Sequence, residues 1–411
     1  MGSLREDADR IIAEAIQDVL PDQAVEQALK EKVFSDGKIY VVAAGKAAWQ
    51  MSKAAYRLLG DRIKQGVAIT KYHHVKGEIP GIVCYEAGHP VPDENSFAGT
   101  QAALELVHGL SDQDTVLFLL SGGGSALFEK PLITGRELAD LTKQLLACGA
   151  DIVEINTIRK RLSAVKGGRF AKLCEPAHVY SIVLSDILGD PLDMIASGPA
   201  YPDSSVCETA LAIAEKYHLR LSSQAMQCLH METPKKLTNV ETVITGSVKK
   251  LCQAAARACR SLGYETFLLT DQLTCEAKEA GAFLASIAKS HAGSGKRLAF
   301  LAGGETVVHL TGNGTGGRNQ ELALAAADGI AGLAGTAVFS IGSDGTDGPT
   351  DAAGGYCDWR TKDRLAAQGI TIYEVLRQND AYHALQKCDG LILTGPTGTN
   401  VNDVAVLLIR E

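Results

Sequence analysis

The strongest constraint on the fold is a regular alternation of short apolar runs with longer segments of helical periodicity. Runs such as "KIYVVAAG", "DTVLFLL" and "VYSIVLSD" are continuously apolar, as expected for strands whose two faces are both covered by helices. Segments such as "KAAWQMSKAAYRLLG" and "GRELADLTKQLLACG" repeat apolar residues at helical spacing. This pattern predicts an α/β protein with an open sheet between two layers of helices.

The length of the chain predicts two domains, because 411 residues exceed what one hydrophobic core usually supports. The first set of alternating elements ends in a more polar stretch, "LHMETPKKLTNVETVITGS". A second set of apolar runs follows: "TVITG", "TFLLTD", "LAFLAGGE", "TVVHLTG", "TAVFSIGSDG" and "GLILTGPTG", closed by "DVAVLLI". We therefore expect an N-terminal domain over residues 1–235 and a C-terminal α/β domain over 236–411.

Composition excludes several classes of partner. The net charge is −8 and there is no long basic run, so we expect no nucleic acid partner. No window approaches the roughly 18 consecutive apolar residues of a membrane span. The N-terminal residues form an amphipathic pattern unlike a signal or transit peptide. The ten cysteines lack C-x-x-C spacing, which is typical of reduced thiols in a cytoplasmic protein.

Glycine-rich loops follow three strands of the expected first sheet. Open α/β sheets bind ligands at the carboxyl ends of their strands, so these loops are candidate binding elements. Consecutive glycines also expose backbone N–H groups that can surround phosphate oxygens. The loops are Gly45-Lys46, the oligoglycine loop Ser121-Gly122-Gly123-Gly124-Ser125, and "SDILGDPLDMIASGP" with Asp186, Asp190 and Asp193.

The second half of the chain repeats this theme with carboxylates. Asp344, Asp347 and Asp351 lie within one glycine-rich loop, a pattern that predicts either a Mg²⁺ site or a base beside a cation. The tandem pair His73-His74, by contrast, has no partner at metal-ligand spacing, and we assign it no function.

Taken together, cations, oligoglycine loops and aspartates at strand ends are typical of phosphoryl transfer. Donors and cations hold the phosphates, carboxylates hold Mg²⁺, and a base accepts the hydroxyl proton. Neither the P-loop pattern nor the protein-kinase signatures are present.

A dinucleotide-binding turn is the main alternative, because Gly312, Gly314 and Gly317 form a G-x-G-x-x-G motif between an apparent strand and an alanine-rich helix. That motif also requires an acidic residue about 20 positions later, at the end of the next strand. Position 337 lies inside the run "TAVFS", and Asp344 comes too late. The sequence therefore disfavours a dehydrogenase.

Eight blocks along nearly the whole chain resemble the class II glycerate 2-kinase family. They are "AAGKAAWQM", "EAGHPVPDENS", "LLSGGGSALFE", "INTIRKRLSAVKGGRFA", "LSDILGDPLDMIASGPAYPDSS", "GGETVVHLTGNGTGGRNQELALA", "SDGTDGPTDAAGG" and "TGPTGTNVND". The resemblance implies an N-terminal Rossmann-like domain, a C-terminal MOFRL domain and an active site in the cleft between them. It implies ATP- and Mg²⁺-dependent phosphorylation of D-glycerate to 2-phosphoglycerate, with release of ADP. Because members are often labelled hydroxypyruvate reductases, an NAD(P)H-dependent reductase is an alternative, as is a kinase for another small hydroxy acid.

The resemblance also implies site residues. Lys46 and Arg318 match the family's cationic pair and suit neutralisation of the glycerate carboxylate and of the transferring phosphoryl group. Glu305, Asp344 and Asn400 match other substrate-site residues of the family. D-Glycerate and ATP are thus the expected partners, and a homodimer is compatible with the sequence.

Further roles come from our own interpretation of the loops. We assign the ATP phosphates to the oligoglycine loop Ser121–Ser125, and a metal or the phosphate region to Asp186 and Asp190. For the general base, the Asp186 loop and the Asp344 loop are both candidates.

Overall fold

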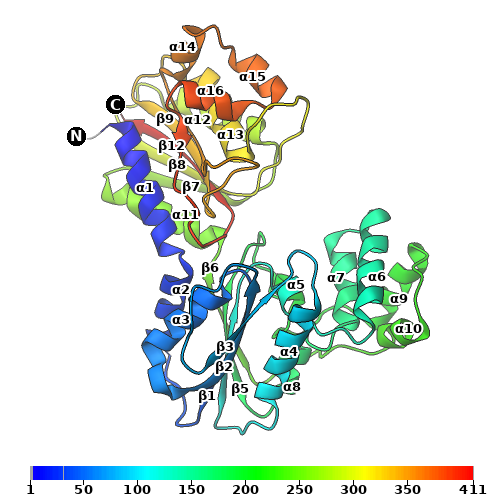
Figure 1. The fold of residues 1–411 in the computed structure, drawn as a ribbon. Coiled ribbons are helices and arrows are strands. Elements are labelled where there is room, and N and C mark those ends of the chain that lie inside the picture. The colour runs from blue at the N-terminus through cyan, green and yellow to red at the C-terminus, as the bar shows by residue number, and fades with distance from the viewer. Residues whose placement is uncertain (1–2, 31, 411) are drawn as a thin grey trace. The chain divides into compact units, whose positions relative to one another are not determined.

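The computed structural model describes residues 3–30 and 32–410, which form two compact units (Figure 1). The N-terminal unit comprises Pro21–Thr245. The C-terminal unit comprises Gly246–Glu411 together with Met1–Leu20. We describe each unit by itself. Among the described residues, no helix has the length and apolar character needed to cross a membrane.

The N-terminal unit contains a six-stranded sheet in the order β3-β2-β1-β4-β5-β6. Its pairs from β3 through β5 are all parallel. This is the strand order of dinucleotide-binding folds, and it reverses direction between β1 and β4. The strands are β1 (Ile39–Ala44), β2 (Ile63–Lys71), β3 (Ile82–Ala87), β4 (Thr115–Leu120), β5 (His178–Leu184) and β6 (Val240–Gly246).

Strand β1 explains why the apolar runs are continuous. Val41 and Ala43 pack in the core on one face of the sheet, whereas Val42 and Ala44 pack in the core on the other. Successive side chains of a strand point to opposite faces, so a strand covered on both sides must be apolar throughout. The elements flanking the sheet are α2 (Pro21–Lys30), α3 (Ala48–Leu59), η1 (Gly60–Arg62), α4 (Glu94–Val107), α5 (Gly124–Leu127), α8 (Arg169–Leu173) and η2 (Ile195–Ser197).

Four further helices of this unit form a group beside the sheet (Figure 1). They are α6 (Gly135–Ala147), α7 (Ile152–Arg161), α9 (Cys207–Lys216) and α10 (Ser223–Leu229), and we call them the helical insertion. Leu141, Ile158, Ile213 and Leu229 belong to a hydrophobic core of its own. The insertion therefore adds a separate layer next to the sheet, which the sequence pattern did not predict.

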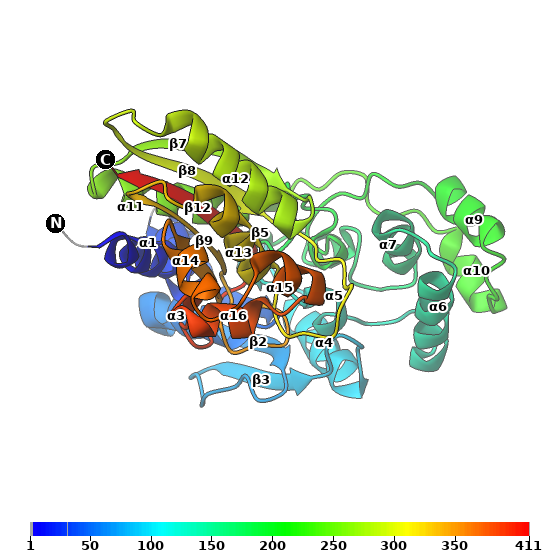
Figure 2. The same cartoon turned by 90° about the horizontal axis from the view of Figure 1, so that it is seen from above.

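The C-terminal unit contains a second six-stranded sheet, in the order β11-β10-β9-β12-β8-β7. Figure 2 shows four of these strands, β9, β12, β8 and β7. Only β7 and β8 are parallel; the last strand of the chain, β12, lies antiparallel between β8 and β9. The two-unit α/β architecture is confirmed, with a mixed second sheet. The strands are β7 (Glu265–Leu273), β8 (Arg297–Gly304), β9 (Thr336–Gly342), β10 (Gly354–Asp358), β11 (Leu391–Ile392) and β12 (Asp403–Arg410).

The N-terminal helix α1 (Leu4–Asp18) packs with the C-terminal unit, beside α11 (Val248–Ser261). Its buried Asp7 accepts hydrogen bonds from Tyr264 Oη at 2.6 Å and from Arg410 Nη1 at 3.2 Å. The sequence division placed this helix in the first domain, and it placed the run "TVITG" of β6 in the second. Long-range contacts decide both placements, and amphipathic periodicity does not identify the partner. The other helices of this unit are α12 (Ala277–His291), α13 (Arg318–Ile330), α14 (Thr361–Ala366), α15 (Ile372–Gln378) and α16 (Ala381–Lys387).

Candidate functional site

Two loops of the N-terminal unit are joined where the strand order reverses between β1 and β4. Lys46 N donates to Gly122 O at 2.9 Å, and Ala47 N donates to Ser121 Oγ at 3.1 Å. Gly45 has φ +124°, and a Cβ there would lie 2.2 Å from Ser121 Oγ, so only glycine allows this approach. The geometry thus fixes Lys46 beside the oligoglycine loop.

The backbone of Lys46 is held by the end of β2 and by the turn that follows it. Its carbonyl oxygen accepts a hydrogen bond from Thr70 Oγ1 at 3.1 Å and lies 3.0 Å from His74 Nδ1. Because a carbonyl can only accept, His74 Nδ1 carries the proton. His74, to which we assigned no function from sequence, therefore positions Lys46.

His89 also lies beside the oligoglycine loop, and the sequence analysis did not single it out. It follows β3, and a Cβ on Gly123 would lie 3.1 Å from His89 Nε2 and 3.3 Å from Lys46 Cγ. Burial lowers the pKa of His89, as do the positive charges of Lys46, Lys71 and His74, so the imidazole is neutral at pH 7. Its place directly after a parallel strand, in the block "EAGHPVPDENS", was the available signal.

The oligoglycine loop keeps donors available for a ligand. No other described residue accepts a hydrogen bond from the backbone N–H groups of Gly122 and Gly123. Gly123 has φ +85°, a conformation that favours glycine. Lys46, moreover, has no carboxylate partner among the described residues. A cation next to unengaged N–H groups is suited to phosphate oxygens.

The predicted metal residues lie along the loop after β5. Asp186 Oδ2 lies 2.4 Å from the position that a Cβ on Gly122 would take, so its carboxylate is against the oligoglycine loop. Asp190 has φ +52°, and its Oδ1 is buried without a hydrogen-bond partner. Within the described residues, no three or more His, Cys, Asp or Glu side chains are grouped to hold a metal alone. Mg²⁺ is usually held by one or two carboxylates together with phosphate oxygens, so these residues fit that ion beside a nucleotide.

In the C-terminal unit, Arg318 is the first residue of α13 and is surrounded by carboxylates. Its Nε and Nη2 donate to the two oxygens of Asp403 at 2.5 and 3.1 Å, and Nη1 donates to Glu305 Oε1 at 2.7 Å. The register of β12 places Asp403 opposite Gly304 and Gly342, between the ends of β8 and β9. Although burial opposes it, Asp403 and Glu305 raise the pKa of Arg318. The guanidinium is therefore permanently charged and fixed in orientation.

The three aspartates of the 343–351 loop make separate contacts and do not form one cluster. Asp344 Oδ1 accepts from Thr346 N at 3.0 Å, which closes a local turn. Asp351 accepts from Tyr382 Oη at 2.8 Å. The backbone oxygen of Asp344 accepts from Thr397 N at 3.2 Å, which links it to the loop that carries Asn400, a partly buried residue.

Asp347 has a different task from the one expected of this loop. It is buried, and it accepts hydrogen bonds from the backbone N–H groups of Asn319 and Gln320 at 3.2 and 2.9 Å. Gly317 at the helix start has no side chain to cap α13, so Asp347 supplies the cap from another loop. Asp347 thereby holds the turn that carries Arg318.

The glycine motif does not form a dinucleotide-binding turn. The run "TVVHLTG" before it is irregular rather than a strand, since β8 ends at Gly304 and α13 begins at Arg318. The N–H group of Gly314 donates to Gln378 O at 2.8 Å, and that of Gly312 donates to Asn379 Oδ1 at 2.9 Å. These donors are used in packing against the α15–α16 connection, where a pyrophosphate would need them free.

Known proteins match the chain along its whole length. A domain of unknown function, DUF4147, matches residues 7–230, and the MOFRL family matches 298–403. D-Glycerate 2-kinase of Thermotoga maritima is 51% identical over 99% of both chains, and glycerate 2-kinase of Pyrococcus horikoshii is 40% identical over 99% of this chain and 98% of that one. The crystal structure of Thermotoga maritima glycerate kinase superposes with a TM-score of 0.95 over 99% of both chains, at 51% identity.

The chain belongs to the glycerate 2-kinase family. One other relative, from Agrobacterium vitis, has the provisional name hydroxypyruvate reductase; it is 37% identical over 91% of this chain and all of its own length. The N–H groups of Gly312 and Gly314 already donate to protein atoms, so the glycine motif does not favour an NAD(P)H-dependent reductase.

The cap of α13 predicts a pH dependence for this glycerate 2-kinase family member. Burial raises the pKa of Asp347 to about 6, against the hydrogen bonds from Gln320 and Asn319. A folded pKa above the ordinary value of 3.8 means that the folded state binds more protons, so this contribution to stability is full below about pH 4 and is lost as the pH rises through 6. Between about pH 4 and pH 6, the free energy of unfolding of the wild type should therefore fall by about 3 kcal/mol because of Asp347. In Asp347→Asn this fall should be absent.

Denaturant unfolding at several pH values checks this prediction. The exposed Asp351→Asn, in the same loop, is the matched control and should keep the wild-type pH dependence. If the free energy of unfolding of wild type and of Asp347→Asn changed equally with pH, the raised pKa of Asp347 would not be the cause.

Proposed function

We propose that this protein is an ATP-dependent D-glycerate 2-kinase, which transfers the γ-phosphoryl group of ATP to the 2-hydroxyl of D-glycerate and releases ADP. The observation that carries the proposal is Lys46 beside the unengaged N–H groups of Gly122 and Gly123, at the point where the strand order reverses. Open α/β sheets bind their ligands at this point. Membership in the glycerate 2-kinase family supports the choice of substrate.

The N-terminal unit holds the phosphates in this proposal. The loop Ser121–Ser125 donates its free N–H groups to phosphate oxygens, and Lys46 contributes a point charge to the transferring group. His89, neutral beside Lys46, adds a ring nitrogen to the same place. Positioning and charge stabilisation are the main requirements of phosphoryl transfer.

Asp186 and Asp190 are the residues that would hold Mg²⁺. One carboxylate lies against the phosphate loop, and the other has a buried oxygen without a hydrogen-bond partner. When bound, the ion neutralises charge on the phosphates.

The C-terminal unit supplies Arg318, which we assign to the glycerate carboxylate or to the transferring phosphoryl group. Asp403 fixes the orientation of the Arg318 guanidinium. The exposed Glu305 is the partner that a substrate anion can replace. Asn400 is a further substrate-binding residue of this proposal. Asp186 and Asp344 are both candidates for the base that takes the hydroxyl proton. Loss of kcat with retained ATP affinity and an unchanged Mg²⁺ requirement, in Asp186→Asn or in Asp344→Asn, would identify it.

Two assays on one purified sample test the proposed function. The first follows ATP consumption with D-glycerate and Mg²⁺ and identifies the product by NMR; the second follows NADH or NADPH oxidation with hydroxypyruvate. We expect 2-phosphoglycerate and no oxidation of the nicotinamide. Oxidation without ATP turnover would replace the proposal by the reductase, and turnover with another small hydroxy acid alone would change the substrate. Cytoplasmic location and a homodimer stay predictions.

A further inference from the structure

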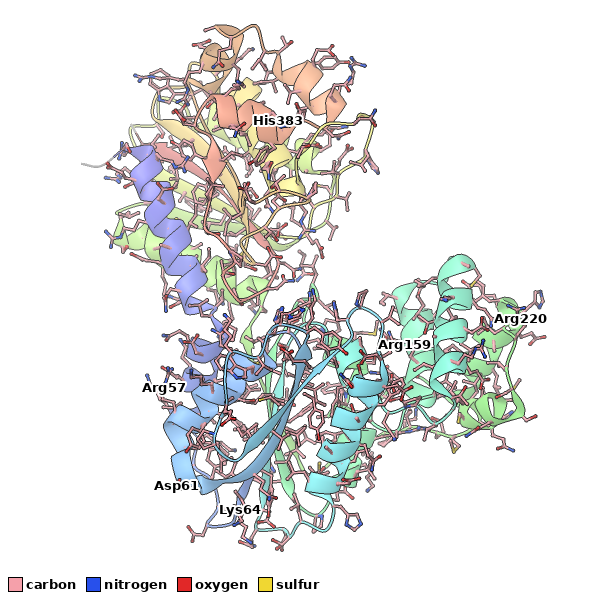
Figure 3. The ribbon with its side chains drawn as sticks, in the orientation of Figure 1. Arg57, Asp61, Lys64, Arg159, Arg220 and His383 are labelled. Carbon is pink, nitrogen blue, oxygen red and sulfur yellow. The ribbon has the colours of Figure 1, made fainter. Side chains whose placement is uncertain are left out.

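Two cationic side chains meet at the end of the oligoglycine loop. The carbonyl oxygen of Ser125 accepts hydrogen bonds from Arg159 Nη2 at 3.1 Å and from Lys166 Nζ at 2.8 Å. Arg159 belongs to α7 of the helical insertion, on the side that faces α5 (Figure 3). The insertion therefore reaches the loop to which we assign the ATP phosphates.

The charge of Lys166 is balanced, whereas that of Arg159 is not. Lys166 and Glu129 are both fully buried and lie 3.4 Å apart. Burial lowers the pKa of Lys166 to about 8, and the nearby Arg159 acts in the same direction. Among the described residues, no carboxylate lies within ion-pair distance of Arg159, and its buried Nε has no hydrogen-bond partner.

The next two residues of α7 are also cations, and within the described part of the chain both have carboxylate partners, unlike Arg159. Lys160 pairs with Asp203 at 3.1 Å, and Arg161 lies 3.5 Å from Glu232. A partly buried cation without an anion is costly, and binding of an anion offsets that cost. The planar fork of arginine suits phosphate oxygens in particular.

We propose that Arg159 is an additional phosphate-binding residue, which contacts the phosphates of the nucleotide held by the Ser121–Ser125 loop. This inference rests on the proposed function for the identity of the anion. It also gives the helical insertion a role, because the insertion then carries part of the nucleotide site. Arg159 remains bonded to Ser125 O through Nη2, which leaves Nη1 to donate to a phosphate oxygen.

Equilibrium binding of ATP, ADP and AMP to Arg159→Met tests the proposal without using glycerate. A phosphate contact predicts a loss of about 10- to 100-fold in ATP affinity, since a hydrogen bond to a charged group contributes about 1.5–3 kcal/mol. The loss should fall from ATP to ADP to AMP. A purely structural role at Ser125 would weaken all three nucleotides by one common factor, and that result would overturn the proposal.

Matched variants keep the test decisive. Arg220→Met changes an exposed arginine of the same insertion and should leave all three affinities unchanged (Figure 3). If Arg159→Met fails to fold, Arg159→Lys keeps the charge without the fork and should show a smaller loss with the same order among the nucleotides. Unchanged ATP affinity in a folded Arg159 variant refutes the inference while the kinase assay stands. A graded loss in a protein that does not phosphorylate glycerate refutes only the proposed function.

Discussion

Replacement of Arg318 by alanine is expected to lower kcat about 10³-fold and to destabilise the C-terminal unit by about 3 kcal/mol. The loss of activity follows if, as proposed, the fixed guanidinium binds the glycerate carboxylate or the transferring phosphoryl group. The loss of stability follows because Asp403, which Arg318 holds through two hydrogen bonds, would be left as a buried, unpaired carboxylate. Steady-state kinetics and denaturant unfolding measure the two effects separately.

A second substitution separates the two consequences of removing Arg318. Burial raises the pKa of Asp403 to about 6 although Arg318 lowers it, so this carboxylate is costly to keep charged. Arg318→Ala combined with Asp403→Asn should therefore regain most of the lost stability and remain inactive. Arg377, an exposed residue of α15, is the control. Arg377→Ala breaks only a surface ion pair with Glu374 and should change neither kcat nor the free energy of unfolding measurably. Recovery of activity in the double variant would exclude a direct role for Arg318.

Lys46→Ala should also lower kcat about 10³-fold, but with little change in stability. Among the described residues Lys46 has no carboxylate partner, so its removal leaves no buried charge behind. The backbone contacts from Thr70, His74 and Gly122 involve only main-chain atoms of Lys46 and are retained in the variant. Kinetics with D-glycerate and ATP, together with a thermal unfolding midpoint, check both parts.

Lys64→Ala is the matched control for this prediction. Lys64 is exposed near the start of β2, whereas Lys46 follows the end of the parallel strand β1 (Figure 3). The control should retain wild-type kcat. Near wild-type kcat in Lys46→Ala would remove Lys46 from the chemistry and with it the observation that carries the proposed function.

Several parts of the site could be predicted because they are local in the sequence. The oligoglycine loop and Gly45-Lys46 directly follow apolar strands, so their place at the carboxyl edge follows from the parallel sheet. Other parts could not be predicted. His89 and Arg159 reach the same loop from the segment after β3 and from the helical insertion, and no spacing in the sequence relates them to it.

The glycine motif and the aspartate loop show the limits of pattern more clearly. Gly312 and Gly314 match a dinucleotide pattern, yet their N–H groups bond to residues 378 and 379, more than sixty positions later. Asp344 and Asp347 are three positions apart, yet one closes a local turn and the other caps α13. A motif specifies which groups are available, and tertiary contacts decide which of them are already used.

The sequence by itself determined the α/β class, the presence of two units, the family and the loops at the strand ends. The class, the two units and the loops depend on periodicity and on backbone freedom at glycine, whereas the family rests on the resemblance of eight sequence blocks; all of these are properties of short segments. Only the tertiary structure decided that α1 packs beside α11, that β12 lies antiparallel between β8 and β9, and that Asp403 meets Arg318. Those contacts join segments far apart in the chain, and their energies depend on partners that no local pattern identifies.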